Sequence, residues 1–348
     1  MKGINRDSNF ELLRIIAMVL VLVVHTGFVS IGTPSLEDVA SQPMVSFARF
    51  SLQSFSVVCV NLFILLSGWF GIKPKKIRFF ELIFQVLFFL LLGLLISIIS
   101  SKLGCLPELT KKEIILGITL LSPQGYWFVL SYLLLYILSP VLNAYTGMAS
   151  IELQQRILIA FFVFEFIFGW MSTGVLWFVK GYSTVSFVGL YLLAYYLRHA
   201  TREKTYVFLR LPARYYFYGY IFISFFTACC AFIFAGNSYV VERLYFYNSP
   251  FVVLSSICLF LFFSKLRLQK QTINWIASSS FAIYLFHCNP FLFNSVYTNI
   301  INHLYNHYPF FTWIIIVVLF ICLVFIISIL FDRIRILLWN KVRMMIFK

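Results

Sequence analysis

Charged side chains are scarce in this chain of 348 residues. Asp, Glu, Lys and Arg make up 11% of the sequence, whereas soluble domains carry roughly a quarter. Hydrophobic residues make up 61%, and the mean hydropathy is +0.93. Such a composition excludes an ordinary soluble domain, and it predicts an all-α polytopic membrane protein.

Several common chemical motifs are absent. The seven cysteines form no CxxC pair, so we expect neither a disulfide framework nor a metal site and interpret them as small packing residues. The chain has no GxGxxG, Walker or GxSxG motif and no evident internal repeat. The longest segment between apolar runs, 102–123, is too short to fold as a soluble domain. Any chemistry therefore takes place in the membrane or at its two faces.

The net charge of +15 has a topological explanation. Runs of about 20 apolar residues predict ten membrane spans in a single domain, 1–348. With both termini cytoplasmic, 21 of the 27 Lys and Arg residues lie inside and 6 outside, as the positive-inside rule requires. We therefore expect no nucleic-acid partner. The expected spans are 10–31, 47–71, 77–101, 124–146, 157–177, 180–198, 215–236, 248–264, 273–295 and 310–332.

The first apolar run has the general order of a signal peptide, but no A-x-A-like cleavage site follows it, so we expect it to be retained. It opens with Ser8 and Glu11 in the S-x-x-E pattern of a capping box, which predicts a helix start near Asn9.

This first span carries one arginine and one histidine, Arg14 and His25, eleven residues apart. At about 100° per residue, eleven steps come close to three full turns, so both lie on one face, about 16 Å apart along the axis. Taken separately, each residue has an ordinary explanation. The Arg14 side chain would extend to the lipid headgroups of the inner face, and His25 would lie near the outer interface. Two ionisable groups on one stripe of a membrane helix favour a functional site instead.

Arg14 and His25 match the R-x10-H motif of the membrane-bound acyltransferase-3 family, and three further stretches resemble that family in the same order. The segment 61–70 (NLFILLSGWF) resembles its second-span signature, with a basic cluster behind it. Tyr126-Trp127-Phe128, followed by Tyr132, Pro140 and Asn143, resembles its aromatic span, and 280–287 (SFAIYLFH) resembles its late S-x-x-I-Y-L-x-H segment. The basic cluster is formed by Lys73, Lys75, Lys76 and Arg78, and it departs from the arginine-rich family pattern.

The resemblance implies an O-acyltransferase that moves an acyl group, most often acetyl, from cytoplasmic acyl-CoA to a hydroxyl of a capsular or exopolysaccharide glycan. The chain is similar to the stand-alone members of this family, which have no SGNH hydrolase domain. It implies a bacterial plasma membrane location, no bound cofactor beyond acetyl-CoA or another acyl-CoA as co-substrate, and no metal. The implied partners are the bilayer, acyl-CoA, a glycan or lipid-linked oligosaccharide acceptor, and polysaccharide-assembly proteins.

Within this scheme, neutral His25 is the candidate general base for the acceptor hydroxyl; an acyl-imidazole intermediate is the alternative. Arg14 is the candidate anchor for the anionic donor, together with the basic cluster (Lys73, Lys75, Lys76 and Arg78). That cluster also fits a purely topological role, and the two roles are compatible.

Four further residues are weaker candidates. Glu165, an acid within the apolar segment FFVFEFIFGW, is able to orient His25, pair with an arginine or stay protonated in the core. Trp127 and Tyr284 fit either a substrate cavity or ordinary packing. His287 matches the family segment and lies at a depth similar to that of His25.

Other readings stay open. His303 and His307 have the i,i+4 spacing of metal ligands, but no carboxylate or cysteine lies near them in sequence, so we expect a solvated loop. A transporter or flippase for a polysaccharide precursor is the alternative function, although such proteins commonly show internal repeats. A polysaccharide polymerase or ligase would need a larger external loop with arginines.

Overall fold

The computed structural model describes residues 7–121, 125–172, 177–203 and 205–346. Every regular element in these ranges is helical, as the composition predicts. The chain divides into two compact units, one of 1–28, 32–73 and 130–274 and the other of 29–31, 74–129 and 275–348.

Six helices in the described ranges are long and apolar enough to cross a membrane. They coincide with the expected spans one to four, seven and ten as candidate membrane spans, while the total of ten remains a prediction. The expected cytoplasmic location of both chain ends falls on residues 1–6 and 347–348, which lie outside the described residues. The six helices are Ser8–Val29, Pro43–Phe70, Lys76–Lys102, Trp127–Met148, Ala213–Ile233 and Phe310–Ile346.

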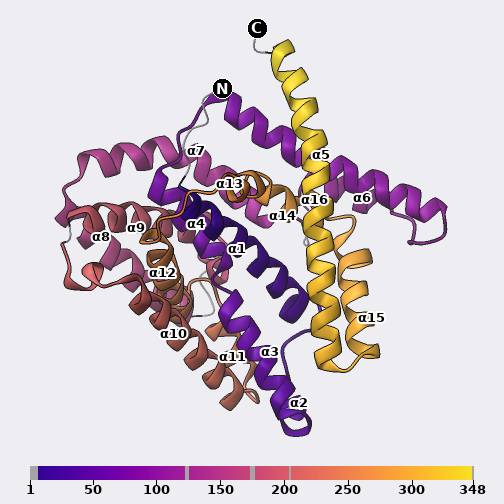
Figure 1. Cartoon of the computed structure of the whole chain (residues 1–348), viewed down its shortest axis with the longest axis horizontal. Coiled ribbons are helices and arrows are strands. Elements are labelled where there is room, and N and C mark those ends of the chain that lie inside the picture. The colour runs from indigo at the N-terminus through magenta and orange to yellow at the C-terminus, as the bar shows by residue number, and fades with distance from the viewer. Residues whose placement is uncertain (1–6, 122–124, 173–176, 204, 347–348) are drawn as a thin grey trace. The chain divides into compact units, whose positions relative to one another are not determined.

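The first unit is a helical bundle (Figure 1). Helix α10 packs against α12 and α3, α4 packs against α9 and α1, and α8 packs against α9. Its principal elements are α1 (Ser8–Val24), α3 (Pro43–Ser56), α4 (Cys59–Phe70), α8 (Ile151–Phe164), α9 (Thr184–Glu203), α10 (Ala213–Ile233) and α12 (Pro250–Ser264), with most of α7 (Trp127–Met148) and the short helices α2 (Leu36–Ser41) and α11 (Ser238–Leu244).

Helix α1 does not begin as a capping box. Its N-cap is Asp7, which makes no side-chain capping bond. The Ser8 hydroxyl instead accepts from the backbone N–H of Lys270 at 2.9 Å, and Glu11 pairs with Arg14. Both side chains that the capping box required are thus engaged elsewhere.

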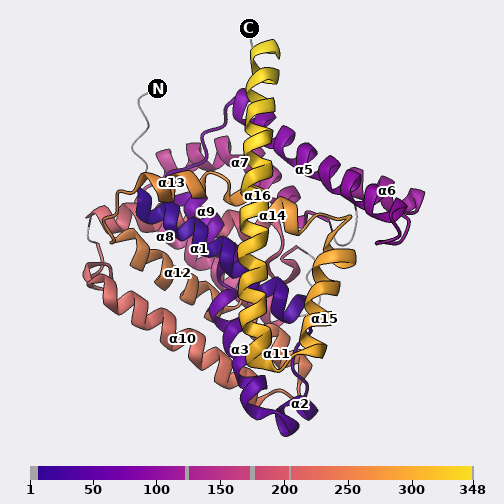
Figure 2. The same cartoon turned by 45° about the vertical axis from the view of Figure 1, so that its right-hand side comes forward.

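The second unit is built around the long helix α16 (Phe310–Ile346), which runs beside α15 (Asn299–His307) in both views (Figure 2). Helices α5 (Lys76–Lys102) and α14 (Ser280–His287) also pack against α16, and α6 (Lys111–Ile118) follows α5.

The expected ninth span, 273–295, is not one continuous helix. Helix α13 (Gln271–Ala277) ends before Ser278, α14 ends at His287, and a π-helix begins at Phe293. Pro290 accounts for the second break, because proline has no N–H to donate and disfavours helical geometry in the residue before it. His303 and His307 belong to α15 and not to a loop, although both are exposed.

Candidate functional site

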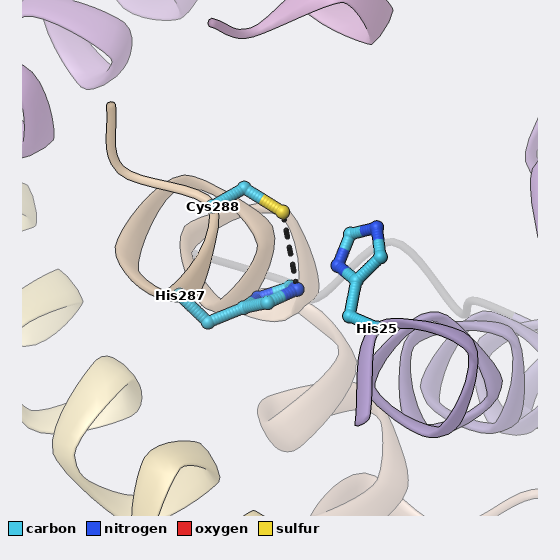
Figure 3. Close-up of side chains that lie close together, drawn as sticks. All are labelled: His25, His287 and Cys288. Atoms are coloured by element: carbon cyan, nitrogen blue, oxygen red, sulfur yellow. Dashed lines mark hydrogen bonds between the residues drawn. The ribbon is translucent and has the colours of Figure 1, made fainter. Parts of the chain in front are cut away.

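Arg14 and His25 both lie on α1, which is regular α-helix from Ser8 to Val24. His25 keeps helical backbone angles and is the first residue of a π-helix, His25–Val29. The uninterrupted helix between the two residues meets the geometric condition for sharing a face. Figure 3 shows His25 at the end of this helix. Thr26 beside it is buried and donates to the Leu22 carbonyl at 2.6 Å.

Arg14 has an acidic neighbour that the sequence reasoning assigned to a helix cap. Its Nη1 lies 3.0 Å from Glu11 Oε2, and the arginine side chain stays 33% exposed while that of Glu11 is 9% exposed. A partly exposed guanidinium retains donors for a further anionic group.

Two other family-like stretches meet near Arg14 in the same unit. The Tyr132 hydroxyl lies 3.4 Å from Ser67 Oγ, and the helix that carries Arg14, α1, packs against α4, which carries Ser67. Ser67 donates to the Phe63 carbonyl at 2.9 Å, which leaves Tyr132 as the donor to Ser67. Arg14, Ser67 and Tyr132 come from α1, α4 and α7, so the fold brings three separate motif stretches together.

Gly68, the residue after Ser67, permits close packing of two helices. A Cβ at this position would lie 2.2 Å from the Tyr191 carbonyl oxygen on α9. The glycine of the S-G pair is therefore required by helix packing.

The end of α4 is held by a compact hydrogen-bond network. Tyr191 donates to Asn143 Oδ1 at 2.7 Å and accepts from the Ile72 N–H at 2.9 Å, while Asn143 Nδ2 donates to the Ile72 carbonyl at 2.8 Å. Arg198 donates to the Trp69 carbonyl at 2.8 Å. These contacts fix the chain next to the basic cluster, whose members Lys73, Lys75, Lys76 and Arg78 are all exposed.

Glu165 is buried, with 1% of its surface exposed, and begins a π-helix, Glu165–Met171. The polar partner that the structure places at its carboxyl is the Ser186 hydroxyl, and its Oε1 is buried without a hydrogen bond. Ser186 thus stands where the sequence reasoning allowed His25 or an arginine.

The second unit contains the remaining candidates. Tyr284 lies between Tyr126 and Phe128, at ring-centroid distances of 5.8 and 5.6 Å, and its ring lies 6.1 Å from that of His287. Trp127 is half-buried beside these two aromatic residues. Tyr284 and His287 are thus brought together in a buried aromatic group.

Three residues that the sequence did not indicate as site candidates support this group. Tyr126 is fully buried and donates to the Leu285 carbonyl. Asn289 Nδ2 donates to the Phe89 carbonyl at 2.7 Å. Cys288 Sγ lies 3.2 Å from His287 Nε2, the contact drawn as a dashed line in Figure 3. The Asn289-Pro290 dipeptide inside an apolar run was the available signal, since it marks a chain break.

The family model Acyl_transf_3, described as an acyltransferase domain, matches residues 7–333. Neither a curated protein nor a solved structure matches the chain.

Proposed function

The chain belongs to the acyltransferase-3 family of membrane acyltransferases, and on this basis we propose that it transfers an acetyl group from acetyl-CoA to a hydroxyl of a cell-surface or capsular glycan at a bacterial plasma membrane. The observation that carries this proposal is that three family-like stretches meet: Ser67 contacts Tyr132, and α1, which carries Arg14, packs against α4, which carries Ser67. Lipid-linked oligosaccharide is the other form in which the acceptor hydroxyl would be presented, and polysaccharide-assembly proteins are the expected protein partners.

In the proposed mechanism, Arg14 binds the anionic donor. The Glu11 carboxylate orients its guanidinium through Nη1, and the guanidinium pairs with phosphate more strongly than a neutral donor would. The exposed residues of the basic cluster add long-range attraction for the donor, which salt screens.

His25 acts as the general base in this mechanism. Its ring takes the proton of the acceptor hydroxyl as the oxygen attacks the acyl carbon, and a positioned base of this kind accelerates such a step by about 10²–10⁴-fold. Ionisable groups on one stripe of α1 then have separate tasks, with donor binding at Arg14 and proton transfer at His25.

The test uses purified full-length protein in lipid nanodiscs with radiolabelled acetyl-CoA and deacetylated capsular glycan. Wild type is compared with Arg14→Ala and His25→Ala, and the exposed residues Arg156 and His307 supply the matched controls Arg156→Ala and His307→Ala. Label is expected on the glycan with wild type and both controls. If the wild type transfers no acyl group from acetyl-CoA or from other acyl-CoA donors, the proposed reaction is wrong. That result would favour the transporter alternative.

A further inference from the structure

His287 and Cys288 place an imidazole beside a thiol within the second unit. Cys288 Sγ lies 3.2 Å from His287 Nε2, and His287 Nδ1 lies 2.7 Å from the Ile283 carbonyl oxygen (Figure 3). A carbonyl oxygen only accepts, so the neutral ring has its proton on Nδ1 and Nε2 accepts from the thiol. Nucleophilic catalysis uses this arrangement, in which a nucleophile contacts a base and a third group orients the base. Here the three groups are the Cys288 thiol, the His287 ring and the Ile283 carbonyl.

The chain break behind this pair is held in place by one asparagine. Asn289 Nδ2 donates to the Phe89 carbonyl at 2.7 Å and to the Tyr126 hydroxyl at 3.3 Å, and Asn289 Oδ1 accepts from the Phe291 N–H at 3.0 Å. A Cβ at Gly93 on α5 would lie 2.2 Å from the Asn289 amide, so the asparagine fits closely against that helix. Cys288 and His287 therefore stand on a rigid support.

The surroundings of the pair suit a thioester. His287 is 3% exposed and Cys288 is 8% exposed. The rings of Tyr284 and Tyr297 lie 6.1 and 5.6 Å from the His287 ring. Exclusion of water protects a reactive acyl intermediate from hydrolysis.

Tyr284 also offers a phenol donor next to His287, the ring that contacts the thiol. Tyr126 is the neighbouring phenol, but its proton is already donated to the Leu285 carbonyl. Tyr284 is thus the phenol that would stabilise negative charge developing on an acyl oxygen.

We propose that Cys288 carries the acyl group as a thioester between donor and acceptor, with His287 as its base. The Cys288 sulfur attacks the thioester carbon of acyl-CoA while its proton passes to His287 Nε2. The bond between the acyl carbon and CoA sulfur breaks, and CoA leaves as the thiol with that proton. One thioester replaces another, so the step needs no oxidant or reductant.

The second half of the reaction rests on the proposed function. The acceptor hydroxyl oxygen attacks the acyl carbon of Cys288, the bond between that carbon and the Cys288 sulfur breaks, and the acceptor proton ends on the departing sulfur. The products are an ester and the free Cys288 thiol, and the enzyme returns to its starting state.

The experiment incubates full-length protein in nanodiscs with radiolabelled acetyl-CoA and no acceptor, then quenches in acid. Wild type is expected to hold label that neutral hydroxylamine removes, with peptide mass spectrometry locating it on Cys288. It should also exchange labelled CoA into acetyl-CoA without acceptor. Cys288→Ala is expected to lose both signals, whereas Cys322→Ala, an exposed cysteine on α16, should keep them.

Separate outcomes distinguish this proposal from the proposed function. Glycan acetylation by wild type without trapped label, or with full activity in Cys288→Ala, overturns the Cys288 intermediate and leaves the transfer reaction standing. Label on another residue overturns it as well. Label on Cys288 without transfer to glycan supports the intermediate and contradicts the glycan acceptor.

The variant Cys288→Ser, which keeps the size of the side chain, is used where Cys288→Ala is poorly folded. It is expected to lose the hydroxylamine-labile label and the CoA exchange. Retention of that label in Cys288→Ser would overturn the proposal.

Discussion

The two units differ in how they hold their candidate chemistry. In the first unit the central side chain is a charged one, Arg14, with a carboxylate at 3.0 Å and a third of its surface exposed. In the second unit His287 has a thiol on one ring nitrogen and a backbone carbonyl on the other, and both members of the pair are buried. Exposed charge suits the capture of an anionic donor, whereas a buried neutral pair suits covalent chemistry that water must not reach.

The second unit also contains a buried ionic network, away from that neutral pair in sequence. Asp332 Oδ1 accepts from Arg335 at 2.8 and 2.9 Å and from Gln85 at 3.2 Å, and Arg335 lies 3.5 Å from Glu81. These contacts join α5 to α16 and support the helices that flank α14. We therefore assign a structural role to the charged network of Asp332 and Arg335, and a ligand-binding role to Arg14 in the first unit. The following substitutions test that contrast.

The largest effect is expected for His25→Ala. Glycan acetylation should fall by about 10²–10⁴-fold, because a general base is lost. Acetyl label on Cys288 should nevertheless persist, since His25 serves the acceptor step only. Rates of transfer and of label formation, measured beside His307→Ala, check this. Loss of both signals would show that His25 acts before the acyl group reaches the enzyme.

Asp332→Asn is expected to destabilise the protein by about 3–5 kcal/mol, because it leaves the buried Arg335 without most of its compensating charge. Thermal unfolding in detergent measures the change. The exposed Lys341 on the same helix supplies the control Lys341→Gln, expected to stay within about 0.5 kcal/mol. An unchanged unfolding temperature in Asp332→Asn would show that the network is not structural.

Arg14→Ala is expected to weaken donor binding by about 1.5–3 kcal/mol, which is the range for a hydrogen bond to a charged group. The KM for acetyl-CoA should rise by about 10–150-fold, while saturating donor restores most of the rate. Steady-state kinetics beside Arg156→Ala provide the test. A fall in kcat with constant KM would instead place Arg14 in the chemical step.

Gly68→Ala is expected to cost about 1–3 kcal/mol of stability, because the new methyl group would lie 2.2 Å from the backbone of Tyr191. Gly147 is a matched control, since nothing lies within 4 Å of a Cβ built there. Unfolding temperatures of both alanine variants are compared with that of the wild type. Equal stability of the two would mean that α4 and α9 are able to separate without cost.

Part of the site was predictable because it depends on one helix. The spacing of Arg14 and His25 needs nothing beyond α-helical periodicity, and α1 has that regularity. The partners of these residues were not predictable in the same way. Ser8 and Glu11 read as a capping box, yet one binds the backbone of Lys270 and the other binds Arg14. A local pattern cannot register a partner 262 residues away.

Hydropathy and charge, which are local properties, determined the helical membrane class and the six helices that are long and apolar enough to span a membrane. Pro290 marks a break in the ninth segment, but tertiary structure alone decided which other helices hold that break in place. Asn289 holds the break through the Phe89 carbonyl, 200 residues away. The physical reason is that a helix forms from bonds within one segment, whereas a buried polar group must be satisfied by whichever segment the fold places beside it.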